Sequence, residues 1–205
     1  GSQNTALGMQ ALGSNTTADN NTGVGYQSLK ANTTGTRNTA IGSFALDANT
    51  TADNNTAVGT HSMTDNTTGA ENSAFGQSSL TNNTTASGNT AIGHQVLFTN
   101  TTGANNTAIG KNALVVNTTG ASNVAVGALV LDANITGASN VAIGISALTN
   151  DTKGNKSIAI GDNALSSQNF TSSTDSLNVA VGHRAGVAVT TGIQNTFVGG
   201  LAGDA

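Results

Sequence analysis

The sequence predicts an all-β protein, a parallel β-solenoid of about twelve coils of 17 residues each. Three observations lead to this fold class. An Asn-x-Ala-x-Gly pattern recurs every 17 residues along nearly the whole chain. Each copy of the repeat holds two short apolar stretches separated by turn-forming residues, as expected for one short-stranded coil. A glycine in every copy and the frequent Asn-Thr-Thr clusters argue against helix.

The repeat is numbered here from its first residue, position 1, to position 17. The copies begin at Asn4, Asn21, Asn38, Asn55, Asn72, Asn89, Asn106, Asn123, Asn140, Ser157, Asn178 and Asn195. The step from Ser157 to Asn178 is 21 residues, so this copy carries a four-residue insertion. No linker or change in composition divides the chain. We therefore expect one β-solenoid domain over residues 1–205, with an irregular coil at 157–177.

Several positions of the repeat predict local structure. Position 5 is glycine in every copy, which indicates a backbone corner that a side chain would obstruct. Position 2 is almost always β-branched, which favours a strand there. Asparagine recurs at position 12, and stacked coils would align these side chains into a hydrogen-bonded ladder. The ladder would contain Asn15, Asn32, Asn49, Asn66, Asn83, Asn100, Asn117 and Asn134.

Side chains alternate between the two faces of a strand, so position 3 points away from positions 2 and 4. Position 3 is alanine in ten copies, and alanine is also common at position 8. A column of alanines is unusual on a solvated surface. We therefore predict that positions 3 and 8 contact another chain, and that the apolar positions 4 and 9 form each chain's own core. The predicted contact residues are Ala40, Ala57, Ala74, Ala91, Ala108, Ala125, Ala142, Ala159 and Ala180. The opposite assignment, with alanines inside and the Ile/Leu columns between chains, stays open.

Composition argues against several classes of partner. Only 8% of the residues are charged and the net charge is -4, which gives no attraction for nucleic acid or for an anionic membrane surface. No apolar run approaches the roughly 20 residues of a membrane span. The chain has no cysteine, and its three histidines lack metal-ligand spacing. Glu71 is its only glutamate, and Asp19 and Asp53 are expected in solvated turns. We expect no enzymatic activity, no metal and no cofactor.

The pattern N-[TV]-A-[IV]-G-x-x-A-L appears as NTAIGKNAL (106–114), NVAIGISAL (140–148) and SIAIGDNAL (157–165). It resembles the head repeats of YadA-like trimeric autotransporter adhesins, and more closely the 17-residue repeats of bacteriophage tail fibre proteins. The resemblance implies a left-handed β-roll, three chains around a threefold axis, and an extracellular place on a cell surface or a virion tail fibre. Threonine at position 2 in seven copies departs from the valine of the adhesins and favours the phage branch.

Two irregular features are candidate recognition sites. The insertion, SSQNFTSSTDSL at 166–177, should bulge from the regular coils. Phe170 would be its apolar contact for a glycan or a protein, with Gln168, Asn169 and Thr171 as hydrogen-bonding neighbours. Phe170 could instead fold back over the roll. The residues at positions 6 and 7 also vary freely, which fits either recognition or an unconstrained surface.

The sequence supports three functions in order. The first is a non-catalytic structural and adhesive module of a homotrimeric fibre that attaches to a glycan or protein receptor on a host cell. The second is an ice-binding solenoid, which requires the threonines of position 2 or of Asn-Thr-Thr to face solvent. The third is a polysaccharide-degrading tail spike, for which the chain lacks an evident pair of carboxylates.

Overall fold

The computed structural model describes residues 1–205, which form β-strands and turns and no helix. Each of the twelve copies contributes one three-residue strand at positions 2–4. The chain divides into two compact units, Gly1–Thr102 and Gly103–Ala205, and each is a parallel β-solenoid with the predicted period. The repeat passes from Thr102 to Gly103 without any change of pattern, so the sequence gives no sign of this division.

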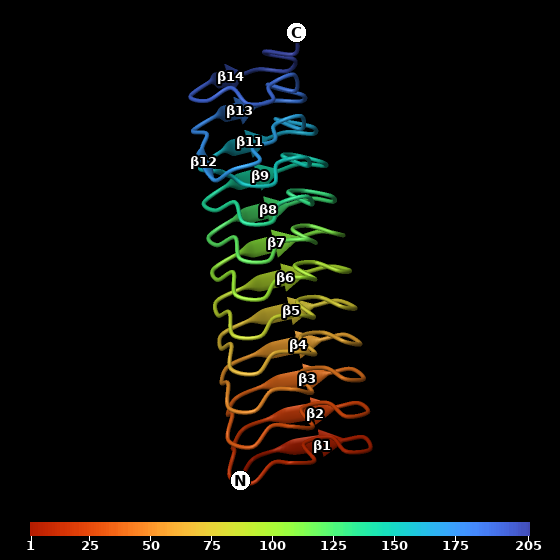
Figure 1. Ribbon diagram of the computed structural model, residues 1–205. Helices are drawn as coiled ribbons and strands as arrows, with labels where there is room; N and C mark the ends of the chain where they lie inside the picture. Colours follow the sequence, from red (N-terminus) through yellow and green to blue (C-terminus); the bar gives the residue numbers. More distant parts are fainter. The chain divides into compact units, whose positions relative to one another are not determined.

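In the N-terminal unit, six strands pair in parallel and in chain order (Figure 1). They are β1 (Thr5–Leu7), β2 (Thr22–Val24), β3 (Thr39–Ile41), β4 (Thr56–Val58), β5 (Ser73–Phe75) and β6 (Thr90–Ile92). Each residue pairs with the residue 17 positions later, for example Ala40 with Ala57. Equivalent side chains therefore lie directly above one another.

The C-terminal unit holds a six-stranded parallel ladder and a separate two-stranded one. The six-stranded ladder consists of β7 (Thr107–Ile109), β8 (Val124–Val126), β9 (Val141–Ile143), β11 (Ile158–Ile160), β13 (Val179–Val181) and β14 (Thr196–Val198). The two-stranded ladder pairs β10 (Gly154–Asn155) with β12 (Thr174–Asp175). Ile158 of β11 pairs with Val179 of β13, so the sheet keeps its register across the four extra residues.

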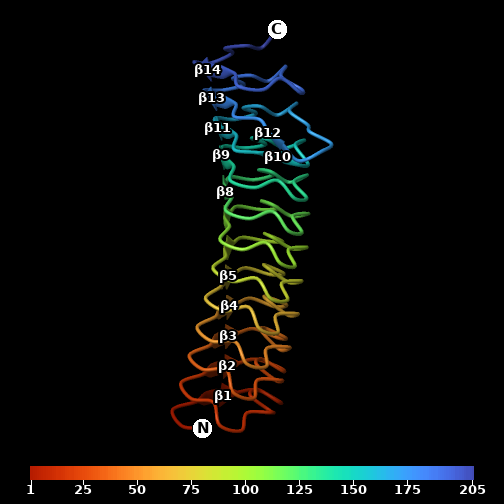
Figure 2. The same ribbon diagram turned by 60° about the vertical axis from the view of Figure 1, so that its left-hand side comes forward.

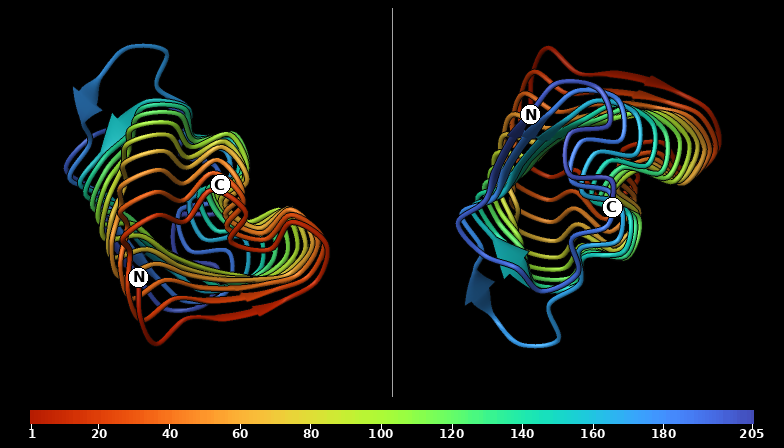
Figure 3. Two further views of the ribbon diagram at one scale, coloured as in Figure 1. Left: turned by 90° about the horizontal axis from the view of Figure 1, so that it is seen from below. Right: turned by 90° about the horizontal axis from the view of Figure 1, so that it is seen from above.

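Backbone hydrogen bonds between neighbouring coils continue through the turns (Figure 2). Leu29 N–H donates to the Ala45 carbonyl at 3.0 Å, and Thr33 N–H donates to the Thr50 carbonyl at 3.0 Å. Turns of one sequence thus satisfy the polar groups of the next, which buried backbone requires. Seen along the stacking direction in Figure 3, the regular coils within each unit follow nearly the same outline.

The core of each coil is formed by positions 3, 8 and 9. Leu114 at position 9 and Ala108 at position 3 are fully buried, whereas Ile143 at position 4 is 37% exposed. The prediction that position 9 lies in the core is confirmed, and the same prediction for position 4 is wrong. A Cβ added at Gly23, in position 3, would lie 3.4 Å from Cγ of Leu12, in position 9. Position 3 thus faces a leucine across a thin interior, where alanine fits.

The predicted chain-contact alanines must be corrected for the same reason. All nine are fully buried inside their own chain and cannot touch another one. They are Ala40, Ala57, Ala74, Ala91, Ala108, Ala125, Ala142, Ala159 and Ala180. The alternative assignment is right in placing the alanines inside and the position 4 side chains outside.

The predicted glycine corner is confirmed. Gly42 has φ of +136°, and a Cβ on it would lie 2.5 Å from the carbonyl oxygen of Gly59 in the next coil. Position 5 therefore needs glycine both for its dihedral angle and for the close approach of the next coil.

Two asparagine ladders hold the coils together. At position 12, as predicted, Asn49 Nδ2 donates to Asn32 Oδ1 at 2.8 Å, and it also donates to the Ala52 carbonyl in its own coil at 3.2 Å. A second ladder at position 1 was not predicted. There the backbone N–H of Asn38 donates to Asn21 Oδ1 at 2.9 Å, while Asn21 Nδ2 donates to the Gly35 carbonyl at 2.8 Å.

Candidate functional site

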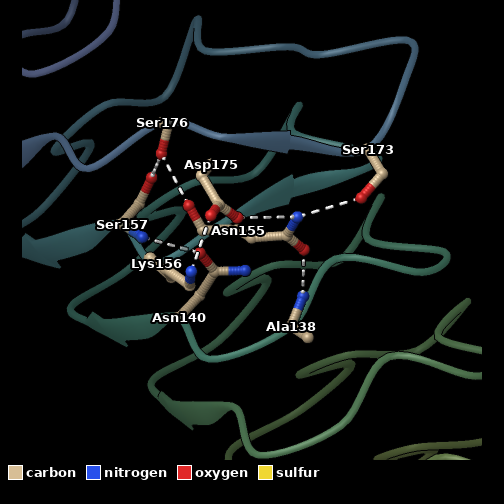
Figure 4. Close-up of polar contacts among 8 residues, drawn as sticks. All are labelled: Ala138, Asn140, Asn155, Lys156, Ser157, Ser173, Asp175 and Ser176. Carbon is tan, nitrogen blue, oxygen red and sulfur yellow. Dashed lines mark hydrogen bonds and ion pairs between the residues drawn. The ribbon is translucent and has the colours of Figure 1, made fainter.

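The insertion of the C-terminal unit is the main irregular feature, and it projects beyond the outline shared by the regular coils (Figure 3). It leaves the coil after Phe170 and returns through β12, which pairs with β10 of the preceding coil. Lys156 Nζ and Asp175 Oδ2 form an ion pair at 2.6 Å between these two coils (Figure 4). The hydrogen bond from Lys156 lowers the pKa of the Asp175 carboxyl.

Polar side chains fix the base of the insertion (Figure 4). Asn155 Nδ2 donates to Ser173 Oγ at 3.0 Å, and Asn155 Oδ1 accepts from the N–H of Ala138 at 2.8 Å. The hydroxyls of Ser157 and Ser176 are hydrogen bonded to each other, and Ser176 Oγ donates to the Asn155 carbonyl at 2.9 Å. The loop is therefore tied to the coil on which it lies.

The four predicted recognition residues separate into two pairs. Phe170 is only 6% exposed and Gln168 is fully buried, whereas Asn169 and Thr171 are exposed. The prediction that Phe170 is displayed on the loop is wrong, and the alternative that it folds back against the roll is right. The exposed surface of the insertion is polar instead, at Asn169 and over residues 171–173.

Gln168 is buried because it takes a rung of the position 12 ladder. Its Nε2 donates to Asp151 Oδ2 at 2.6 Å, and its Oε1 accepts from Asn178 Nδ2 at 2.8 Å. Asp151 is the preceding rung, and its carboxylate also accepts from the N–H groups of Gly154 and Phe170. A carboxylate cannot donate to the rung below, and Oδ1 of Asn134 has no hydrogen-bond partner. The amide ladder is thus interrupted just before the insertion.

The outer face of the strands is a second candidate site. All position 4 side chains in both units are apolar and exposed or half-exposed, with β-branched or small polar side chains beside them at position 2. In the N-terminal unit Phe75 is 41% exposed, and in the C-terminal unit Ile143 has similar exposure. Each unit therefore presents a flat apolar column along its sheet.

The Asn-Thr-Thr turn presents a different surface. The asparagine is buried in the ladder, and the first threonine bonds to the next coil, as Thr33 Oγ1 does to the Thr50 carbonyl at 3.1 Å. The second threonine is exposed in every copy that has one, for example Thr34 and Thr51. The turn role predicted for this tripeptide agrees with these contacts.

The remaining acidic and basic residues form no further cluster. Asp53 Oδ1 accepts from the N–H of Thr36 at 2.6 Å and from its hydroxyl at 3.0 Å, as a turn residue would. No group of three or more His, Cys, Asp or Glu side chains is placed to hold a metal ion, and the surface has no pocket. The chain forms no helix with the length and apolar character needed to span a bilayer.

No known family model, curated protein or solved structure matches this chain. The resemblance to adhesin and tail fibre repeats therefore stays a prediction that rests on the repeat residues themselves.

Proposed function

We propose that this chain is a non-catalytic attachment module of a homotrimeric fibre, carried outside the cell on a phage tail or a bacterial surface. The observation that supports the proposal is the apolar column at position 4, which every coil exposes. The repeat resemblance adds the left-handed β-roll and the threefold arrangement.

The apolar column fits contact with identical copies. A monomer rarely exposes apolar side chains in so regular a row, and large exposed patches mark interaction surfaces. Burying such surface contributes about 25 cal/mol per Å². A closed symmetric assembly uses the same face of every copy, and the column offers the same side-chain type at each coil. The chain contact thus moves from position 3, as first predicted, to positions 2 and 4.

The insertion would remain free in such an assembly. β11 keeps its pairing with β9 and β13, so the strand face is regular in the copy that carries the extra residues. The exposed residues Asn169 and Thr171 would then offer hydrogen bonds to a host glycan or protein receptor, once per chain. Three such sites on one trimer could bind a multivalent surface with increased avidity.

Sedimentation equilibrium tests the assembly. We expect a mass of three times 20.1 kDa for the parent chain. Ile143→Gln, on the strand face, should dissociate the trimer while the circular dichroism spectrum stays that of β-structure. Ile145→Gln is the matched control, because Ile145 is 57% exposed but lies in the turn of the same coil. A parent chain that is monomeric at micromolar concentration would overturn the trimer.

Ice binding is the second candidate, and the exposed second threonine of each Asn-Thr-Thr favours it. These threonines repeat at the spacing of neighbouring strands, about 4.8 Å. A thermal hysteresis assay separates the two functions. Hysteresis in a monomeric parent chain, lost when Thr34, Thr51 and Thr68 are replaced by lysine, would favour ice binding over attachment.

A further inference from the structure

Three aromatic rings on consecutive coils of the N-terminal unit form a cluster at the variable positions 6 and 7. The ring centroids of Tyr26 and Phe44 are 5.1 Å apart and the rings meet edge to face. The rings of Phe44 and His61 are stacked, with centroids 5.0 Å apart and planes only 4° from parallel. Only 3% of the chain is aromatic, so this grouping is not expected from composition.

The fold does not require rings at this place. Position 7 lies in the turn that extends past the ends of the strands (Figure 1), and other copies fill it with Gln, Ser, Asn, Leu or Arg. Phe44 and His61 have φ of 58° and 57°, a left-handed conformation that bulky residues adopt at a cost. Tyr26 is 39% exposed, and His61 is exposed as well. A strained, exposed aromatic cluster points to a binding role rather than to packing.

Hydrogen-bonding groups flank the rings. Gln27 Nε2 donates to the Tyr26 hydroxyl at 3.0 Å and to Gln10 Oε1 at 2.7 Å, which forms a short row of amides beside the cluster. Asp47 lies close enough to His61 for their charges to interact, and its Oδ1 has no hydrogen-bond partner. The cluster therefore combines apolar ring surface with amide groups and one carboxylate oxygen that is not hydrogen bonded.

We propose that the cluster of Tyr26, Phe44 and His61 binds one hexopyranose unit of a surface glycan. The C–H face of a sugar ring is apolar and packs on aromatic side chains, while its hydroxyls need donors and acceptors at the rim. Gln10 and Gln27 offer both, and Asp47 offers an acceptor. A folded protein partner would need an interface of about 1,600 Å² in total, far more than three rings provide.

The inference rests on the proposed attachment function but not on the insertion or on the trimer contact. It adds a sugar site in the N-terminal unit to the polar insertion of the C-terminal unit. It also gives the variable turn a role, for which the sequence left recognition and an unconstrained surface equally open.

The cluster has its own spectroscopic reporter. Tyr26 is the only tyrosine and the chain has no tryptophan, so tyrosine fluorescence observes this site alone. We would titrate the parent chain with methyl β-glucopyranoside, methyl β-galactopyranoside and N-acetylglucosamine to roughly 50 mM, since a single weak site binds in the millimolar range. Saturation-transfer NMR from the aromatic protons to the sugar would detect binding independently of fluorescence.

We expect a saturable response to at least one of the three sugars. Phe44→Ala and His61→Ala should each weaken binding about tenfold, which corresponds to the loss of one aromatic contact in the site. His94→Ala is the matched control, because His94 is exposed in the same turn of the sixth copy, away from the cluster, and should leave the affinity unchanged. The site is overturned if none of the sugars binds by either method, or if Phe44→Ala binds as tightly as the parent.

Attachment to host cells separates this inference from the proposed function. If the parent attaches and the Phe44→Ala and His61→Ala variants attach equally well without binding sugar, the function stands and this site is wrong. If the parent binds a sugar through the cluster but attaches to no host cell, the site stands and the attachment function is wrong.

Discussion

The buried leucines of position 9 are the most constrained residues of the coil. Leu114 is fully buried and has φ of 52°, and the same left-handed conformation recurs at this position in the other leucine copies. An L-residue in this region loses about 1–2 kcal/mol relative to a helical conformation, and branching at Cβ makes it worse. Position 9 is therefore Leu or Met, never Val or Ile, until glycine replaces it in the last two copies.

Leu114→Ile should lower the free energy of unfolding by about 2 kcal/mol, because it adds a β-branch at a positive φ without changing volume. Leu114→Met is the control and should cost under about 1.5 kcal/mol, since Met63 occupies the equivalent place. Urea denaturation followed by circular dichroism measures both. Equal losses for the two variants would show that the backbone conformation at this position carries no strain.

Asp47 gives a pH-dependent prediction. Burial raises the pKa of its carboxyl above the ordinary 3.8, and the charge of Asp65 acts in the same direction. The proton is then held more tightly in the folded state. The contribution of Asp47 to stability is complete below the ordinary value and is lost as pH rises through the higher folded pKa.

Asp47→Thr should remove this loss. At the same position of the next coil, Thr64 Oγ1 donates to the Phe44 carbonyl at 3.3 Å, so threonine fits there. We expect the variant to be more stable than the parent by about 1 kcal/mol at pH 7, where a half-buried, unpartnered carboxylate is charged. The difference should shrink towards pH 3. Urea midpoints at pH 3, 5 and 7 test this, and a difference independent of pH would contradict it.

At the scale of one coil, the strand, the glycine corner and the position 12 ladder could be predicted, because each depends on a single column of the repeat. The side facing the core could not. Alternation places Ala108 and Ile109 on opposite faces but does not say which face is inside. That depends on the width of the coil where position 3 meets position 9, and the sequence does not pair these two positions. Phe170 could not be placed either, because the extra residues follow no column.

The amide ladder should contribute strongly to each coil. Asn83 Nδ2 donates to Asn66 Oδ1 at 2.8 Å and to the Ala86 carbonyl at 2.9 Å, and its own Oδ1 accepts from Asn100 at 3.0 Å. Asn83→Ala leaves several buried groups without partners and should cost about 3 kcal/mol. Asn82→Ala, at the half-exposed neighbouring position, should cost under about 0.5 kcal/mol. Similar unfolding midpoints for the two variants would show that the ladder contributes little.

The last coils exchange large and small residues. Phe197 replaces the usual alanine at position 3, and glycine replaces leucine at position 9 as Gly186 and Gly203. A Cβ on Gly186 would lie 2.9 Å from the Phe197 ring, and one on Gly203 would lie 2.4 Å from it. The ring therefore occupies the space that the leucines fill elsewhere.

A double-mutant cycle tests this exchange. Phe197→Ala should leave a cavity and Gly186→Leu should clash with the ring, and each should destabilise the chain by about 2 kcal/mol or more. The combined variant restores the regular pattern at two positions. We expect it to be more stable than either single variant, with a coupling energy of about 1–3 kcal/mol. Additive losses would mean that the two positions do not share one space.

For the whole molecule, the insertion distinguishes one coil from all others. Deleting residues 172–175 restores the 17-residue step and removes β12 together with Asp175. Because the sheet already keeps its register across the insertion, the variant should fold and keep the mass of the parent. We expect its attachment to host cells to fall. Lys156→Gln is the control, since it breaks only a surface ion pair, which contributes about 0–1 kcal/mol. Unchanged attachment after the deletion would make the insertion a spacer.

Both asparagine ladders have the same polarity. The earlier coil supplies side-chain oxygens and the later coil supplies N–H groups, as Asn38 and Asn49 do to Asn21 and Asn32. A finished coil therefore presents a set of fixed acceptors to whatever residues come next along the chain. During synthesis, each coil that leaves the ribosome would meet a template already in place, and the repeat would fold in the order in which it is made.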